Sequence, residues 1–155
     1  MNQQASNPSA PTSPTPTTGV TGIARIAAAS LAGVQVEVFD TTLRDGLQVE
    51  GVSASVDDKL RIAEQLDFLG VQFIEGGWPG ANPKDIEFFA RAAVDLQPRH
   101  STLVAFGSTR RPRGKVDDDA TLRHLLEAGN AAVCIVAKSW DYHVTEALQT
   151  TLDEG

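Results

Sequence analysis

From about residue 34 onward, the chain alternates four times between a short run rich in β-branched and aromatic residues and a longer segment with helical periodicity. The strand-like runs are residues 34–39 (VQVEVF), 71–75 (VQFIE), 101–106 (STLVAF) and 131–137 (AAVCIVA). Strands that alternate with helices at this spacing are typical of a parallel α/β protein. Two architectures fit, a small doubly wound sheet or the first half of a (β/α)8 barrel. The length of 155 residues taken alone favours the doubly wound sheet, because a whole barrel needs ~250 residues.

The segments between these runs carry the start and stop signals of helices. Ser55 and Asp58 have the spacing of a capping box before a helix expected over residues 56–69, and Gly70 follows as its stop. The later helices are expected to begin at Asn82-Pro83, after the acidic triplet at residues 117–119, and near Tyr142.

The N-terminal part of the chain has a different composition. Residues 1–22 hold four of the eight prolines among Ser, Thr, Asn and Gln, with no aromatic or charged side chain. Such a segment cannot bury enough apolar surface to offset the entropy that ordering costs. We therefore expect a disordered extension over residues 1–33, followed by a folded α/β domain over residues 34–155.

Composition and charge exclude several classes of function. No apolar run approaches the ~18 residues that cross a bilayer, and the single cysteine, Cys134, lies in an apolar run where we expect a small buried hydrophobe in a reducing, cytoplasmic protein. The net charge of −7 argues against nucleic-acid binding. One basic cluster, residues 108–115 (STRRPRGK), is expected to be a solvated loop, with an anionic ligand as the alternative. Phosphate-binding glycine motifs and a GxSxG nucleophile motif are absent from the sequence.

Polar or glycine-rich sequence follows each of the four strand-like runs. The four segments are DTTLRDGLQ, EGGWPGANPKD, GSTRRP and KSWDYH. In either architecture the loops after parallel strands gather on one face, which is where ligands bind. The sequence therefore predicts one functional site at this face.

Arg44 and Asp45 are the strongest candidates within these loops. An aspartate there can ligate a hard divalent cation, and an adjacent arginine can hydrogen-bond a substrate oxygen and stabilise negative charge on it. The alternative is an Arg-Asp pair that only braces a turn. Gln48 could orient this pair or contact substrate. Glu75 ends an apolar strand and needs a partner, for which Arg44 is the natural candidate. Trp78 could line a pocket or serve packing.

These residues resemble a known signature. The string LRDGLQ at residues 43–48, followed after ten residues by Lys59, resembles the first signature of the isopropylmalate synthase and homocitrate synthase family of metal-dependent (β/α)8-barrel enzymes. The longer text, above all EGGWPGANPKD, resembles the citramalate synthase branch, and the likeness covers residues 36–154. The resemblance implies that the fold is α/β, comprising about four β/α units of the N-terminal half of a TIM barrel.

The resemblance also implies an activity and roles for individual residues. The expected reaction condenses acetyl-CoA with pyruvate to give citramalate and CoA, a step of isoleucine synthesis. Arg44 and Glu75 match catalytic positions, Arg44, Asp45 and Gln48 would bind substrate, and Asp45 would ligate the metal. The expected ion is Mn²⁺ or Mg²⁺, with Zn²⁺ as an alternative. The partners are expected to be small molecules, and the full-length protein is expected to be a homodimer.

Three alternatives stay open at this point. The chain could belong to a 2-isopropylmalate synthase of leucine synthesis, or to a lyase of the hydroxymethylglutaryl-CoA type, which shares the string RDGLQ. The family completes its metal site with a His-x-His pair and a further acid on later strands, and this sequence contains neither. We therefore expect an N-terminal fragment that could be inactive alone.

Overall fold

The computed structural model of the chain describes residues 33–155. The disordered extension predicted for residues 1–33 lies outside the described residues, apart from Gly33. Within residues 33–155, no helix has both the length and the apolar character needed to cross a membrane.

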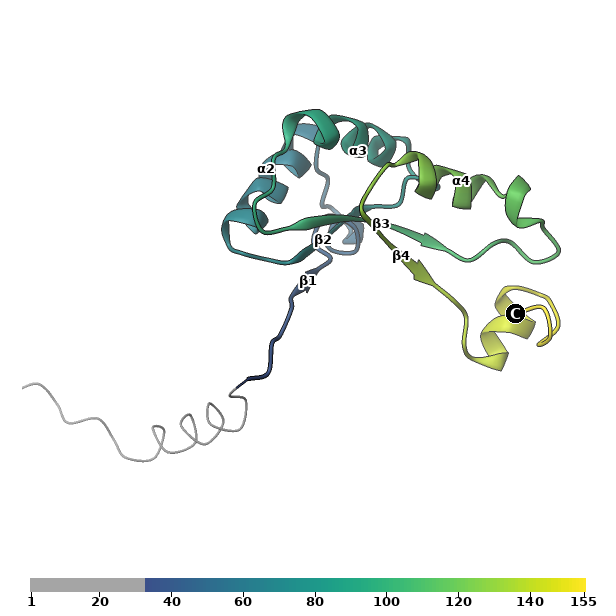
Figure 1. Cartoon of the computed structure of the whole chain (residues 1–155). Coiled ribbons are helices and arrows are strands. Elements are labelled where there is room, and N and C mark those ends of the chain that lie inside the picture. Colours follow the sequence, from purple (N-terminus) through teal and green to yellow (C-terminus); the bar gives the residue numbers. More distant parts are fainter. Residues whose placement is uncertain (1–32) are drawn as a thin grey trace, which may run out of the picture. The chain divides into compact units, whose positions relative to one another are not determined.

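Four parallel strands form the sheet in the same order as they occur in the sequence (Figure 1). They are β1 (Phe39–Asp40), β2 (Phe73–Gly77), β3 (Thr102–Ser108) and β4 (Ala132–Val136). A doubly wound sheet reverses its strand order at a switch point, whereas neighbours in a barrel follow one another along the chain. The order β1-β2-β3-β4 is therefore that of a barrel.

Within residues 33–155, three α-helices connect the strands and lie on the same side of the sheet in Figure 1. They are α2 (Val56–Phe68), α3 (Pro83–Asp95) and α4 (Ala120–Glu127), and the short helical turns are η1 (Gly46–Gln48), η2 (Val116–Asp118) and η3 (His143–Ala147). Helices on one face of a sheet are expected of a barrel, because the other face is the barrel interior. The helix predicted to begin near Tyr142 does begin there, with Asp141 and Tyr142 leading into the short π-helical turn η3.

The caps predicted from the sequence are present. The Ser55 hydroxyl accepts from the Asp58 N–H and the Asp58 carboxylate accepts from the Ser55 N–H, which completes the capping box of α2. The Asn82 side chain caps α3 ahead of Pro83. Asp119, the last residue of the acidic triplet, accepts two backbone N–H groups at the start of α4. Each side chain pairs donors that the first helical turn leaves unsatisfied.

The core lies between the sheet and these helices. Its buried members include Leu60 from α2, Phe88 from α3, Ala105 from β3 and Leu125 from α4. Gly76 of β2 is part of this packing, since a Cβ atom there would lie 2.5 Å from the Phe88 ring. The small residue lets α3 approach the strand closely, and this contact fixes the end of β2 relative to α3.

The first predicted strand is wrong over most of its length. Only Phe39 and the following Asp40 are in β1, and Val38 is 51% exposed. The strand is short because β2, its one neighbouring strand among the described residues, begins only at Phe73. Val38 still accepts a hydrogen bond from the Phe73 N–H at 3.0 Å, so pairing begins only there. The other three strands are confirmed, with ends shifted by one or two residues.

Candidate functional site

The loop that follows β1 holds Arg44 in a tight turn. Backbone N–H groups of Arg44, Asp45 and Gly46 all donate to the carbonyl oxygen of Thr41, at 3.2, 2.9 and 3.1 Å. The side chain of Leu43 is buried in the core and anchors the same turn. Because the backbone is fixed on both sides, the Arg44 side chain leaves the turn from a defined position.

The Arg44 guanidinium bonds two carboxylates. Its Nε donates to Glu75 Oε2 at 2.6 Å, and its Nη1 donates to Asp45 Oδ1 at 2.9 Å. Glu75 is only 1% exposed, whereas the side chain of Asp45 is 63% exposed. The pairing expected between Arg44 and Glu75 is present, and it supplies the opposite charge that a buried carboxylate requires.

Two further residues, not predicted as members of the site, lie close to this pair. The Arg44 guanidinium carbon lies 4.1 Å from the centroid of the Phe106 ring, and Phe106 is in register with Cys134 on β4. Burial raises the pKa of the Cys134 thiol, and the Glu75 carboxylate raises it further. Cys134 is half-buried beside charged groups, so the prediction of a buried hydrophobe is wrong.

The alternation of side chains along β3 places Phe106 on the face of Glu75 once the register with β2 is known. Glu75 is in register with Val104, and Phe106 follows Val104 at the next position on the same face of β3. Ala105, between them, points to the helices and is fully buried in the core. The sequence carries the alternation, whereas the register that completes this signal comes from the structure.

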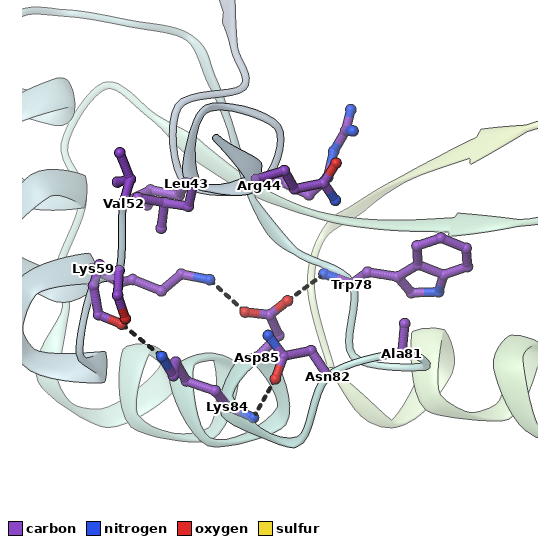
Figure 2. A pocket seen from close by; sticks show the side chains of 13 residues that line it. Leu43, Arg44, Val52, Lys59, Trp78, Ala81, Asn82, Lys84 and Asp85 are labelled. Atoms are coloured by element: carbon purple, nitrogen blue, oxygen red, sulfur yellow. Dashed lines mark hydrogen bonds and ion pairs between the residues drawn. The ribbon is translucent and has the colours of Figure 1, made fainter. Parts of the chain in front are cut away.

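A second ion pair, between Lys59 and Asp85, lies in the interior (Figure 2). Lys59 Nζ donates to Asp85 Oδ1 at 2.5 Å, and the two residues are 2% and 7% exposed. Asp85 Oδ2 accepts the backbone N–H of Trp78 at 2.8 Å. The sequence showed Lys59 only as part of a signature and gave no sign of its partner, which comes from another helix.

A cavity of about 310 Å³ lies beside the Lys59–Asp85 pair, and Figure 2 shows the side chains that line it. Arg44, Gln48, Lys59, Trp78 and Asp85 are among its lining residues. Gln48 is exposed, and among residues 33–155 no hydrogen bond joins its side chain to Arg44 or Asp45. An orienting role for Gln48 is thus not supported, and substrate contact stays a prediction.

The described residues fit a divalent metal only in part. Asp45 offers a carboxylate oxygen, Oδ2, that accepts no hydrogen bond from other described residues, and oxygen is the ligand type that Mg²⁺ and Mn²⁺ prefer. Residues 33–155 contain no group of three or more His, Cys, Asp or Glu that could hold an ion. Asp45 can therefore contribute one ligand but cannot form the site with its described neighbours.

The basic loop after β3 is occupied by an internal pair. Arg110 Nη1 donates to Glu154 Oε1 at 2.5 Å, and the Arg113 backbone N–H donates to the same atom at 2.8 Å. The hydrogen bond from Arg110 lowers the pKa of Glu154. Because Arg110 and Arg113 already contact Glu154, these contacts argue against a binding site for an anionic ligand in this loop.

Comparison with known proteins identifies relatives of the chain. The HMGL-like family model matches residues 35–154. The (R)-citramalate synthase of Streptomyces coelicolor is 58% identical over 118 residues, which are 76% of this chain and 22% of that protein. The (R)-citramalate synthase of Aquifex aeolicus is 55% identical over 78% of this chain and 23% of that protein. The 2-isopropylmalate synthase of Thermosynechococcus vestitus is 38% identical over 77% of this chain and 22% of that protein.

A solved structure has the same fold. The crystal structure of HMG-CoA lyase from Bacillus subtilis aligns with a TM-score of 0.56 and 23% identity, over 77% of this chain and 38% of that chain. The chain spans about a fifth of the length of the synthases it matches. The predicted fold class, about four β/α units of a TIM barrel, is confirmed, as is the resemblance to the citramalate synthase branch. With 120 of its residues matched by the family model, the chain belongs to the HMGL-like family.

Proposed function

We propose that the protein containing this chain is an acyltransferase of the citramalate synthase type, which condenses acetyl-CoA with pyruvate to give (R)-citramalate and CoA. One observation carries the proposal. Five (R)-citramalate synthases are 44–58% identical to the chain over about 120 residues, whereas two 2-isopropylmalate synthases are 32% and 38% identical over the same length. The reaction would serve isoleucine synthesis.

The Arg44 geometry suits the charge that this reaction develops. A bond forms between the acetyl methyl carbon and C2 of pyruvate, and the C2 carbonyl electron pair becomes an alkoxide. The methyl group loses one proton and the alkoxide oxygen gains one, so the proton count balances. Water then cleaves the thioester and releases CoA. Nε and one Nη1–H of Arg44 are already bonded to carboxylates, which leaves the second Nη1–H and both Nη2–H groups to donate to the alkoxide. Glu75 fixes the guanidinium, and the Phe106 ring covers one of its faces.

Asp45 and Gln48 complete the proposed substrate site. Asp45 would supply one oxygen to a divalent ion, Mn²⁺ or Mg²⁺ with Zn²⁺ as an alternative, and such an ion polarises a 2-keto acid as a Lewis acid. Gln48 lies at the same cavity as Arg44, and its amide would donate to the carboxylate of the keto acid.

The test is a CoA-release assay on the whole protein that contains this chain. We expect release from acetyl-CoA that depends on pyruvate, with (R)-citramalate identified by chiral chromatography, and loss of release in Arg44→Met. Release with 2-ketoisovalerate in place of pyruvate would instead indicate a 2-isopropylmalate synthase. Cleavage of HMG-CoA without release that depends on a keto acid would overturn the proposal in favour of a lyase.

We also propose that the whole protein is a cytoplasmic homodimer whose partners are small molecules. The net charge of −7 supports this choice against nucleic acid. Light scattering on the purified protein tests the dimer, and a monomer mass would contradict it.

A further inference from the structure

We propose that Lys59 and Asp85 are positioning residues for the Arg44–Glu75 pair and that they act through the backbone of Gly77 and Trp78. The inference rests on the proposed function, because it gives these two buried residues a part in holding the arginine that would stabilise the alkoxide. Neither residue contacts Arg44 or Glu75 by a hydrogen bond among the described residues.

Stability alone is a weak reason for this buried pair. Lys59 extends from the first turn of α2 and Asp85 from the first turn of α3, and both are in the interior. Burying two charges costs as much hydration energy as their attraction returns, and apolar residues of similar volume often stabilise a protein as well or better. The presence of this pair in the interior therefore indicates that it holds neighbouring groups in position.

The two oxygens of Asp85 have different partners. Oδ1 accepts from Lys59 Nζ, and Oδ2 accepts the Trp78 backbone N–H at 2.8 Å (Figure 2). The end of β2 can pack against this carboxylate only because residue 77 is glycine. A Cβ atom at Gly77 would lie 2.4 Å from Asp85 Cγ, and the φ angle of Gly77 is +151°. Lys59 supplies the positive charge that lets the carboxylate stay in the interior.

The contact holds the backbone at the point where β2 becomes irregular. Glu75 is in register with Val104 and Gly77 with Ala105, so the register shifts between them. Such a bulge redirects the side chains next to it. Asp85 fixes the residue just after the bulge, and Glu75, just before it, accepts from Arg44 Nε at 2.6 Å. The direction of the Glu75 carboxylate thus depends on Asp85.

Two double variants of the whole protein separate the charge from the hydrogen bond. Lys59→Met/Asp85→Leu removes both charges, keeps similar side-chain shapes, and leaves the Trp78 N–H without an acceptor. Lys59→Met/Asp85→Asn also removes both charges but keeps an oxygen that can accept this N–H. The matched control is Asp57→Asn/Arg91→Gln, because Asp57 and Arg91 form an ion pair between the same two helices at 2.5 Å, with side chains 65% and 41% exposed.

The kinetic readout compares kcat with KM for pyruvate. We expect the leucine variant to lose about 10²-fold in kcat, the loss that a displaced catalytic group produces, with an unfolding midpoint no lower than that of the wild type. The asparagine variant should stay within about 5-fold of the wild-type kcat, and the control should match the wild type. Equal losses in the leucine and asparagine variants would overturn the inference.

A second readout needs no activity. In protein labelled with [¹⁵N]arginine, the Nε–H signal of Arg44, assigned with Arg44→Lys, reports the bond to Glu75. We expect this signal to shift and its hydrogen exchange to speed up in the leucine variant, but not in the asparagine variant. An unchanged signal in the leucine variant overturns the inference. If the wild type shows no CoA release with a keto acid, the proposed function fails while this measurement still decides the inference.

A single replacement keeps the test usable if the leucine variant does not fold. Gly77→Ala changes no charge and drives the backbone away from the Asp85 carboxylate. We expect it to lower kcat and to shift the Arg44 signal in the same direction. A folded Gly77→Ala protein with the wild-type Arg44 signal would contradict the inference.

Discussion

The guanidinium carbon of Arg44 lies 4.1 Å from the centroid of the Phe106 ring, so a side chain from the loop after β1 packs on a residue of β3. The same guanidinium donates to Glu75 of β2 at 2.6 Å. Two strands and one loop therefore restrain a single side chain. Restraint of this kind lowers the reorganisation that a charge-stabilising group must undergo during reaction.

Glu75 is more deeply buried than its partner Arg44. Replacing one or the other should therefore lower the free energy of unfolding by different amounts. Arg44→Met leaves Glu75, which is 1% exposed, without an opposite charge, and should lower the free energy of unfolding by about 3–5 kcal/mol. Glu75→Gln leaves Arg44 partly exposed and still bonded to Asp45, and should cost about 1–2 kcal/mol. Urea unfolding of both variants gives the comparison. A larger cost for Glu75→Gln than for Arg44→Met would contradict this account.

Phe106→Leu should lower kcat/KM by about 2- to 30-fold, because a cation–π contact contributes about 0.5–2 kcal/mol. Phe106→Tyr keeps the ring and should stay close to the wild type. Phe106 also packs edge-on against Trp78, with ring centroids 5.3 Å apart, so unfolding midpoints must be measured on the same samples. A leucine variant as active as the wild type would show that the ring contact plays no part.

Asp45→Asn should separate metal binding from folding. The Asp45 side chain is 63% exposed, so removing the negative charge that faces Arg44 should change the free energy of unfolding by less than about 0.5 kcal/mol. The loss of ligand charge should weaken Mn²⁺ binding to the whole protein at least about 10-fold, as measured by isothermal titration. Unchanged Mn²⁺ affinity would remove Asp45 from the proposed metal site.

Features of the fold that depend on local signals could be predicted from the sequence. The Ser55–Asp58 capping box and the positive φ angle of Gly70 follow from spacing and residue type, and both are present. The partner of Glu75 could also be predicted, because a carboxylate that ends an apolar strand needs an opposite charge close by. Each of these inferences required knowledge of only one or two chain segments.

The contacts that escaped prediction depend on packing between distant segments. Lys59 and Asp85 are 26 residues apart on different helices, and either could have been a solvated charge on its own helix. The place of Phe106 beneath Arg44 depends on the register of β2 and β3, which the bulge after Glu75 alters. The shortness of β1 depends on which strands flank it. Sequence patterns specify faces and ends, whereas register and helix approach are set by the assembled core.

Asp67 gives a prediction about pH that is independent of the site. Although burial acts to raise its pKa, backbone N–H groups of Arg99, His100 and Ser101 donate to its carboxylate and lower the pKa to about 2, from 3.8. A pKa lowered by folding stabilises the folded state above pH 3.8, and this stabilisation is lost as the pH falls through 2.

We expect Asp67 to contribute about 1–2 kcal/mol at neutral pH, after allowance for solvent screening. The measurement is the free energy of unfolding of the wild type and of Asp67→Asn between pH 7 and pH 2. The difference between the two proteins should be largest above pH 4 and should shrink toward pH 2, because the protonated aspartic acid accepts these N–H groups no better than the amide. Asp153→Asn, a change at an exposed residue, controls for the removal of one carboxylate. A difference that stays constant over this range would mean that Asp67 acts through shape rather than charge.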